Sequence, residues 1–405
     1  MPVKDVTVLG STGSVGRNTL DVIARHKDLY RVFAVTANTN TERLLEQCHQ
    51  FEPRFAVLQN ADAALQLTRR MKDQGGRTTV LAGVEGLLEV ASHGDCDYVM
   101  AAIVGAAGLE PTLAAVTSGK RVLLANKEAL VMSGSLFMEA VKSSGAEVLP
   151  IDSEHNAIFQ CMPRALHPGA LQPGATSLES KEIRRILLTG SGGPLLREPL
   201  EKLKYVHPDR ACAHPNWKMG RKISVDSATM MNKGLELIEA NWLFDVEMDR
   251  IEVIIHPQSI VHSMVEYLDG SILAQLSSPD MRTPIAHGLA WPQRIDSGVA
   301  SLDFSSLGQL QFESVDLERY PCLRLAMEVL AAGGSMPTVL NAANEVAVQA
   351  YLDELICFTD IPSIIDAVLE RTDAPAAHSI EEILEIDRIT RHTALGMIDT
   401  TQRPQ

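Results

Sequence analysis

Residues 6–24 have the sequence VTVLGSTGSVGRNTLDVIA, in which an apolar run leads into a glycine-rich turn and then a helical pattern. Strand, glycine turn and helix in this order form the context of a dinucleotide-binding fingerprint. The glycines let the backbone approach a pyrophosphate, which then lies at the positive end of the helix. The usual pattern is Gly-x-Gly-x-x-Gly, and Ser11 replaces its first glycine. We expect a nucleotide site here, with a plain structural turn as the alternative.

Apolar runs recur along the first 150 residues and predict a doubly wound parallel sheet. After the run at 6–9 they cover residues 32–36, 55–58, 98–101, 121–124 and 147–149. Helical or loop segments separate them, which is the rhythm of a Rossmann-type α/β fold.

The turn after the second predicted strand indicates which nucleotide is bound. An NAD enzyme usually carries an acidic residue there, which binds the ribose 2′-hydroxyl. The turn of this chain contains Ala37, Asn38, Thr39 and Asn40, without a carboxylate. Neutral donors suit a 2′-phosphate better than a lone hydroxyl, so the turn favours NADP, although it contains no Arg or Lys.

The composition excludes several classes of protein. The 405 residues suggest two or three domains, and the net charge of −15 argues against nucleic-acid binding. The longest apolar stretch, residues 98–109, is well short of the roughly 18 residues that suggest a membrane span. A strand pattern begins within the first ten residues, so we expect no signal peptide. Six scattered cysteines without a Cys-x-x-Cys pair fit neither a disulfide framework nor a thiolate zinc site, and we expect a cytoplasmic protein.

Polar residues follow the strands predicted at 121–124 and 147–149, at the edge where a ligand binds a parallel sheet. Asn126, Lys127 and Glu128 follow the first of these strands. Glu128 alone is equally well explained as a helix-capping acid. Lys127 opposes the helix dipole and therefore suggests an anionic or oxyanionic ligand.

Three carboxylates in two separate runs indicate a metal site. Asp152 and Glu154 are one residue apart after the second strand, and Glu236 lies in the polar run at 224–243. Asn232, Lys233 and Glu236 share one helix face, and a surface ion pair between Lys233 and Glu236 is the alternative. The three carboxylates would supply hard oxygen ligands with open positions, which favours Mg²⁺ or Mn²⁺ over zinc.

A Gly- and Pro-rich loop at 190–222 opens with GSGG, a candidate anion nest, and carries seven Lys or Arg against three Asp or Glu. It is either a surface linker or a lid over a phosphate, and the reversed charge favours the lid. An Asp-Gly turn at 269–270 between alternating apolar runs predicts an antiparallel hairpin, hence a separate α+β unit. His256 and His262 in that unit are interpreted as structural. Four amphipathic helical runs after residue 317 predict a small bundle.

Seven segments of the chain, in the same order, resemble 1-deoxy-D-xylulose 5-phosphate reductoisomerases. They are GSTGSVG, ANKEALV, DSEHNAIFQ, LTGSGGP, HPNWKMGRKISVDSATMMNKGLELIEA, HPQSIVHSM and SPDMRTPIAHGLAWP. The resemblance spans nearly the whole chain, and its block at 214–240 is far too long for chance. It implies that the chain converts 1-deoxy-D-xylulose 5-phosphate and NADPH into 2-C-methyl-D-erythritol 4-phosphate, on the non-mevalonate route to isoprenoid precursors. It also implies a V-shaped homodimer.

The resemblance assigns roles to residues already selected. Asp152, Glu154 and Glu236 match the metal ligands, and Lys127, Glu154 and Glu236 the catalytic residues. The residues that match substrate contacts are Lys127, Ser153, Glu154, Ser191, His214, Ser227, Asn232, Lys233 and Glu236. Trp217 and Met219 match a lid over the substrate. The residues that match NADPH contacts are Thr12, Gly13, Ser14, Val15, Asn126, Glu128 and Gly220.

The resemblance also implies a division into domains. We expect an NADPH-binding Rossmann domain at 1–151, a catalytic and dimerising α+β domain at 152–290 with a mobile lid at 190–220, a linker at 291–316, and a helical bundle at 317–405. Many family members have a basic residue where Thr39 stands, which leaves the contact to the 2′-phosphate open. Residues 163–181 fit no fixed family pattern and suggest a variable loop.

Three other functions were weighed. A Rossmann dehydrogenase of the semialdehyde or homoserine type would explain the first half of the chain but not the carboxylates. A metal-dependent sugar-phosphate isomerase with a vestigial Rossmann unit would leave the nucleotide site without a use. A nucleotide sensor without catalysis would leave the open metal site without a use. Whether the rearrangement is a retro-aldol and aldol sequence or a concerted shift stays open at this point.

Overall fold

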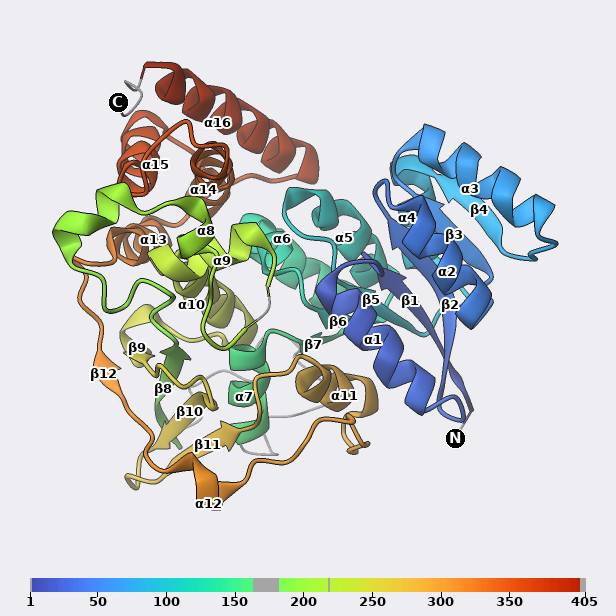
Figure 1. Cartoon of the computed structure of the whole chain (residues 1–405), viewed down its shortest axis with the longest axis horizontal. Coiled ribbons are helices and arrows are strands. Elements are labelled where there is room, and N and C mark those ends of the chain that lie inside the picture. The colour runs from blue at the N-terminus through green and yellow to red at the C-terminus, as the bar shows by residue number, and fades with distance from the viewer. Residues whose placement is uncertain (1, 163–181, 218, 401–405) are drawn as a thin grey trace.

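The computed structural model describes residues 2–162, 182–217 and 219–400, so the loop predicted at 163–181 lies outside the described residues. The chain forms a parallel sheet flanked by helices, a smaller mixed sheet, and a group of C-terminal helices (Figure 1). The predicted α/β class, with a Rossmann-type sheet, a second α+β part and a helical C-terminal part, is confirmed.

Seven parallel strands form the larger sheet, in the order β4-β3-β2-β1-β5-β6-β7. They are β1 (Lys4–Leu9), β2 (Tyr30–Ala37), β3 (Phe55–Leu58), β4 (Thr79–Ala82), β5 (Tyr98–Ala101), β6 (Arg121–Leu124) and β7 (Glu147–Pro150). All the strands predicted in this region are present. β4 was missed because it is short, lies at the edge of the sheet and has no fully buried residue that would give an apolar run.

The strand order reverses between β1 and β5, and ligands of such sheets bind at the carboxyl ends of the strands beside this point. The connecting helices are α1 (Ser14–Arg25), α2 (Thr41–Phe51), α3 (Ala61–Asp73), α4 (Gly83–Ser92), η1 (Ala106–Gly108), α5 (Leu109–Thr117) and α6 (Lys127–Ser144). Because all strands are parallel, the turns after β1, β6 and β7 lie along one edge. The glycine turn, Lys127 and Asp152 therefore belong to the same side of the sheet.

The second sheet has the order β11-β10-β8-β9-β12 and mixes parallel and antiparallel pairs. Its strands are β8 (Ile183–Gly190), β9 (Ile251–Ile255), β10 (Val261–Tyr267), β11 (Ile272–Leu276) and β12 (Glu313–Ser314). The predicted hairpin is confirmed as β10 and β11, with Gly270 at φ +87° in its turn. Helix α7 (Ser153–Cys161) packs against this hairpin, and α11 (Arg282–Ala290) packs against α1 and α7.

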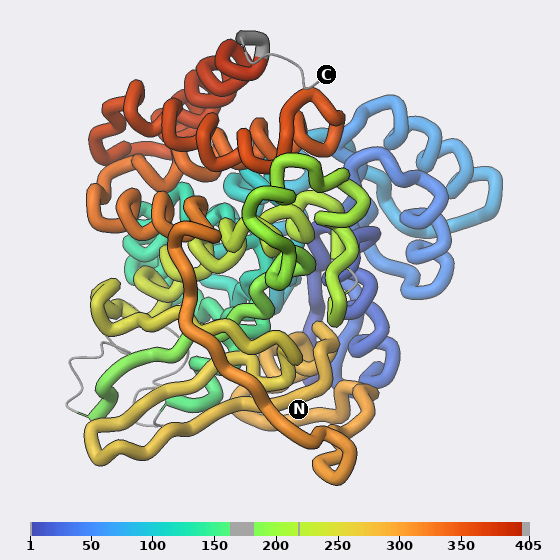
Figure 2. The backbone as a smooth tube through the Cα atoms, turned by 60° about the vertical axis from the view of Figure 1, so that its left-hand side comes forward, coloured from blue at the N-terminus to red at the C-terminus, as the bar shows by residue number. Residues whose placement is uncertain are grey.

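The segment expected to be a linker takes part in the second sheet. After α11 the chain forms the short helix α12 (Phe304–Leu307) and then β12, which pairs with β9. Figures 1 and 2 show this stretch running along the outside of the molecule towards the C-terminal helices.

Helix α10 (Met231–Phe244) packs against α6, which follows strand β6 of the parallel sheet, and against α13 (Pro321–Ala332) of the C-terminal part. It follows α9 (Arg221–Thr229) after Met230, which takes a left-handed conformation at φ 59°. Between β8 and α9 lie η3 (Leu200–Tyr205) and α8 (Pro208–Ala211), and η4 (Met248–Arg250) precedes β9.

Four helices make up the C-terminal part, as predicted. They are α13 (Pro321–Ala332), α14 (Met336–Leu352), α15 (Asp360–Arg371) and α16 (Ile380–Thr400). In the described part of the chain, none of the helices has the length and apolarity needed to cross a membrane.

Candidate functional site

Three carboxylates converge where α7 and α10 meet. Asp152 is the N-cap of α7, Glu154 lies in its first turn, and Glu236 projects from α10. One oxygen of each lies within 4.8 Å of an oxygen of the other two. The Glu236 side chain is 1 % exposed, whereas those of Asp152 and Glu154 are 13 % and 18 % exposed. The sequence-based expectation that the two polar runs meet is therefore confirmed.

Two buried lysines contact these carboxylates. Lys127, the first residue of α6, forms an ion pair with Asp152 and places its Nζ 3.0 Å from Glu236 Oε1. Lys233 forms an ion pair with Glu236 and places its Nζ 3.2 Å from Glu154 Oε1. The Lys233 side chain is 3 % exposed, so the alternative of a surface ion pair with Glu236 is wrong.

Neighbouring amide and hydroxyl groups complete the cluster. Lys127 Nζ donates to Asn232 Oδ1 at 3.0 Å, and Asn232 Nδ2 donates to Glu236 Oε1. Ser153 Oγ donates to Glu154 Oε2 at 2.6 Å. The predicted residues of α6, α7 and α10 thus form one connected polar group.

Burial and charge act in opposite directions on these groups. Burial, and next the charge of Glu236, raises the pKa of Glu154 to about 8. For Asp152, burial favours the neutral form, but Lys127 and His155 outweigh it and hold the pKa below its ordinary value. Three carboxylates face only two ammonium groups, and a divalent cation would remove the remaining repulsion. An all-carboxylate donor set fits Mg²⁺ or Mn²⁺.

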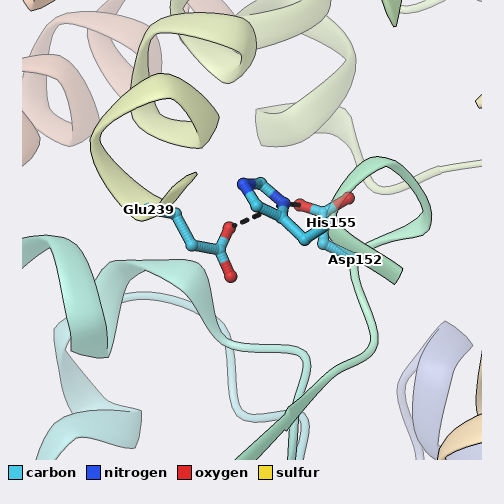
Figure 3. A group of neighbouring side chains, drawn as sticks. All are labelled: Asp152, His155 and Glu239. Carbon is cyan, nitrogen blue, oxygen red and sulfur yellow. Dashed lines mark ion pairs between the residues drawn. The ribbon is translucent and has the colours of Figure 1, made fainter. Parts of the chain in front are cut away.

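Two further buried ionisable residues, His155 and Glu239, lie near Asp152 and were missed in the sequence (Figure 3). His155 Nδ1 lies 3.4 Å from Glu239 Oε2 and 4.0 Å from Asp152 Oδ2, and both His155 and Glu239 are fully buried. Burial lowers the pKa of His155, and burial followed by the charge of Asp152 raises that of Glu239 well above its ordinary value. A signal was present, because His155 follows Asp152 by three residues and Glu239 follows Glu236 by three, on shared helix faces.

The GSGG turn after β8 lies against the same helices. A Cβ on Gly190 would lie 3.0 Å from Lys233 Cε, and a Cβ on Gly193 would meet the backbone oxygen of Ser227 at 2.5 Å. Only glycine fits at Gly193, which also has φ +72°. The turn, which contains Ser191, therefore lies between Lys233 and Ser227.

His214 is held in one tautomer beside this turn. Its Nδ1 accepts from the backbone N–H groups of Asn216 and Trp217 at 3.1 and 3.0 Å, so Nε2 carries the proton and donates to Ser191 Oγ at 2.8 Å. Burial lowers the pKa of His214 to about 4, so the ring is neutral at pH 7. A neutral donor beside the GSGG turn suits an anion such as a phosphate.

Part of the proposed lid is firmly anchored. Leu195, Leu203 and Val206 are buried in one apolar cluster with residues of α13 and α14. Arg197 pairs with Glu313. The loop expected to form a mobile lid at 190–220 therefore packs on the C-terminal helices through part of its length.

The last part of the loop contacts β10 and the segment before it. Trp217 and Met219 are half-buried, and the Trp217 ring lies 6.1 Å from His262, edge to face. Asn216 Nδ2 donates to the backbone oxygen of Pro257 at 2.6 Å. His262 Nε2 lies 2.9 Å from Ser277 Oγ, which agrees with the structural interpretation of this histidine.

The glycine-rich turn after β1 has the close packing that a nucleotide turn requires. Gly10 has φ +77°, and a Cβ on Gly16 would collide with the backbone of Gly10 and Ser11. Ser11, which stands at a glycine position of the usual pattern, links the turn to α2. Its Oγ donates to Gln47 Oε1 at 2.6 Å, and Gln47 Nε2 donates back to Ser11 O at 2.9 Å.

The residues predicted to contact a pyrophosphate remain accessible. Gly13 and Ser14 are exposed, and Thr12 and Val15 are half-buried. Helix α1 begins after Gly13 without a side-chain cap, so its first N–H groups point to an open position.

The turn after β2 differs from the expectation in one respect. Ala37 is buried, whereas Asn38, Thr39 and Asn40 are exposed. Asn40 caps α2, because its Oδ1 accepts from the backbone N–H of Arg43 at 3.1 Å. Arg43 thus brings a cation into the first turn of α2, three residues beyond the segment considered in the sequence.

The remaining predicted nucleotide contacts are placed between the sheet and α9. The Asn126 side chain is used within the protein, because it caps α6 and donates to the backbone oxygens of Ile103 and Gly105. Glu128 is buried against Lys222, with 3.2 Å between Oε1 and Nζ. Gly220, the N-cap of α9, is exposed.

Known protein families match most of the chain. The family described as 1-deoxy-D-xylulose 5-phosphate reductoisomerase matches residues 6–134, and its C-terminal domain matches residues 148–244. The DXP reductoisomerase C-terminal domain matches residues 276–393.

Curated relatives and solved structures agree. The chain is 58 % identical to the 1-deoxy-D-xylulose 5-phosphate reductoisomerase of Pseudomonas fluorescens Pf-5, over 96 % of each chain. It is 59 % identical to that of Aromatoleum aromaticum, over 97 % of this chain and 96 % of that one. A reductoisomerase crystal structure in complex with NADPH, fosmidomycin and magnesium has a TM-score of 0.93 at 46 % identity, covering 98 % of both chains. The Zymomonas mobilis enzyme in complex with NADPH has a TM-score of 0.89 at 46 % identity, over 98 % of this chain and 100 % of that one.

We expect Glu236→Gln to weaken Mn²⁺ binding by more than about 100-fold, since loss of a ligand should exceed the 10–100-fold typical of outer partners. The substitution keeps the size and helix propensity of the side chain but removes one anionic oxygen. Isothermal titration with Mn²⁺ measures the effect, and nucleotide affinity should stay unchanged. The matched control is Glu252→Gln on β9, an exposed position with the same charge change. Wild-type Mn²⁺ affinity in Glu236→Gln would contradict the metal site.

Proposed function

Because the chain belongs to the 1-deoxy-D-xylulose 5-phosphate reductoisomerase family, we propose that the cluster of three carboxylates and two lysines is its catalytic centre. The chain is an NADPH- and divalent-metal-dependent enzyme that converts 1-deoxy-D-xylulose 5-phosphate into 2-C-methyl-D-erythritol 4-phosphate. The observation that carries the assignment of the centre is the convergence of Asp152, Glu154 and Glu236 at the carboxyl edge of the nucleotide-binding sheet.

We assign the metal to these three carboxylates, which fit Mg²⁺ or Mn²⁺. A bound divalent ion would chelate the carbonyl and adjacent hydroxyl oxygens of the substrate and stabilise the negative charge that develops during the rearrangement. Lys127 adds a fixed positive charge beside the same oxygens. Because Lys127 is held by Asp152 and Asn232, its ammonium group is oriented before the substrate arrives.

The substrate phosphate is assigned to the other end of the cluster. Ser191, whose Oγ accepts from His214, offers a neutral hydroxyl donor, and Ser227 lies beside the GSGG turn. Asn232 and Lys233 connect this turn to the metal side. The phosphate is thereby placed apart from the three carboxylates, which would repel it.

The mobile lid stays a proposal, confined to the stretch around residues 212–220. Residues 195–211 pack on the C-terminal helices and cannot open without exposing an apolar cluster. Trp217 and Met219 are half-buried and would cover the substrate, and their closure would exclude water while hydride is transferred.

A dehydrogenase of the homoserine or semialdehyde type would account for the nucleotide turn but would leave the three converging carboxylates without a function. NADPH absorbance with 1-deoxy-D-xylulose 5-phosphate distinguishes the two functions. We expect oxidation of NADPH only when Mg²⁺ or Mn²⁺ is present. Oxidation that persists at full rate in excess chelator, or that requires an amino-acid semialdehyde, would contradict the proposal.

We also propose that Arg43 binds the 2′-phosphate of NADP. Its side chain is 46 % exposed and its ion pair is weak, with 3.8 Å to Glu46. The other acid of this turn, Glu42, is already paired with Arg70. A cation in the first turn of a helix opposes the dipole, so its position is explained better by an anionic ligand.

Arg43→Gln should weaken NADP⁺ binding by about tenfold or more, the loss of one charge-assisted hydrogen bond of roughly 1.5–3 kcal/mol. NAD⁺ binding, which lacks the 2′-phosphate, should change by less than about twofold. Fluorescence titration of both nucleotides measures the difference. Arg54→Gln is the matched control, because Arg54 is an exposed arginine preceding β3, at the opposite edge of the sheet. Equal losses for both nucleotides would exclude Arg43 as the reader of the 2′-phosphate.

A homodimer is proposed from the exposed edge of the second sheet. Strand β11 is at the end of the strand order, and Leu268, Ile272 and Leu273 in this hairpin are each about half exposed. An exposed apolar edge strand pairs readily with another chain. A second copy of this chain would cover it.

Leu273→Lys should convert the dimer into a monomer, since a charge at a buried dimer interface is costly. Sedimentation velocity measures the mass. Leu65→Lys on α3 places the same charge at an exposed leucine far from this edge and should leave the dimer intact. A dimer of unchanged stability in Leu273→Lys would place the interface elsewhere.

The division at residues 151, 290 and 316 and the cytoplasmic location also remain our proposals. The element order supports the first, although residues 304–314 contribute to the second sheet and are more than a linker. All six cysteines are free thiols, as expected in a reducing compartment.

A further inference from the structure

Two fully buried ionisable side chains, His155 and Glu239, have no role in the centre described above. His155 lies in the first turn of α7. It directly follows Glu154, and Asp152 precedes it by three residues. Glu239 lies one turn after Glu236 in α10. The pair therefore sits where the two helices that carry the proposed metal ligands touch each other (Figure 3).

The hydrogen-bond pattern fixes the His155 ring. Its Nε2 lies 2.8 Å from the backbone oxygen of Glu236, and a carbonyl oxygen only accepts, so Nε2 carries a proton. The ring also stacks on Phe244 of α10, with centroids 6.2 Å apart and planes 12° apart. One ring thus ties the first turn of α7 to the backbone at a proposed metal ligand.

The other ring nitrogen faces Glu239. Nδ1 lies 3.4 Å from Glu239 Oε2, and within the described residues neither Nδ1 nor either Glu239 oxygen has a hydrogen-bond partner. A single proton shared by Nδ1 and Glu239 satisfies both groups, whichever of them carries it. Burying two ionisable groups is costly, and fixing a specific geometry is one reason why proteins retain such pairs.

We propose that His155 and Glu239 form a positioning pair that sets the distance between Asp152 and Glu154 on α7 and Glu236 on α10. Outer partners of this kind orient metal ligands and affect metal affinity without touching the ion. The inference rests on the proposed metal role of these three carboxylates and adds the residues that hold them in register.

A second metal ion bound by Asp152, His155 and Glu239 is the competing interpretation, because their ligand atoms lie within 4.8 Å of one another. The positioning pair is favoured by access. His155 and Glu239 are fully buried, whereas Asp152 and Glu154 keep exposed side-chain area that an ion can reach.

Two substitutions of Glu239 with nearly equal volume test the pair. Glu239→Gln keeps a group that donates to His155 Nδ1, whereas Glu239→Met keeps the volume but removes the hydrogen bond. We expect Glu239→Met to weaken Mn²⁺ binding by about 10–100-fold, the range for outer partners, and Glu239→Gln to stay within about threefold of wild type. The kcat of Glu239→Met at saturating Mn²⁺ should recover to within about threefold, so the change appears in the metal requirement.

His155→Gln provides a second variant in case Glu239→Met does not fold, because the glutamine amide can still donate to the Glu236 carbonyl but lacks Nδ1. We expect the same loss of Mn²⁺ affinity, and the double variant His155→Gln/Glu239→Met should lose no more than either single one. Unchanged Mn²⁺ affinity in the folded single variants, or fully additive losses, would overturn the proposal.

The stoichiometry of Mn²⁺ binding separates the remaining outcomes. One ion per wild-type chain and one per Glu239→Gln chain support the positioning pair. Two ions per wild-type chain and one per Glu239→Met chain would overturn it in favour of a second site. Failure of the metal site itself would look different, because wild-type chain would then bind no Mn²⁺ and Glu236→Gln would change nothing.

Discussion

The repulsion among three closely spaced carboxylates is the constraint on which the centre depends. Asp152, Glu154 and Glu236 are brought within 4.8 Å in a region with little solvent. Two lysines compensate part of this charge, and burial, followed by the charge of Glu236, raises the pKa of Glu154 to about 8. A donor set made only of carboxylates favours a divalent ion that prefers hard oxygen ligands.

The fold supplies this cluster from elements far apart in the sequence. Parallel strands β6 and β7 end at the same edge of the sheet and deliver Lys127 and Asp152 there. Helix α10, packed between α6 and α13, brings Glu236 and Lys233 from the other side. The nucleotide turn after β1 lies on the same edge, so the sheet that would bind NADPH also positions half of the proposed metal site.

Local patterns were sufficient to predict much of this. The apolar run at 6–9 followed by GSTGSVG specified β1, its turn and α1, because strand, turn and helix signals occur within twenty residues. Glu236 and Lys233 could be found because they are polar residues in an apolar helix. Long-range packing could not be found in this way. Leu203 and Val206 appeared to belong to a free loop, and only the distant helices α13 and α14 show that they are anchored. The pair of His155 and Glu239 joins two helices. The spacing of three residues from Asp152 and from Glu236 marks each member, but it does not show that the two members meet.

Crystals grown with Mn²⁺ test the central claim most directly, through the anomalous signal of the ion. We predict one anomalous peak between Asp152, Glu154 and Glu236. A peak at His155 and Glu239, or no peak beside the three carboxylates in a chain that oxidises NADPH with its substrate, would contradict it.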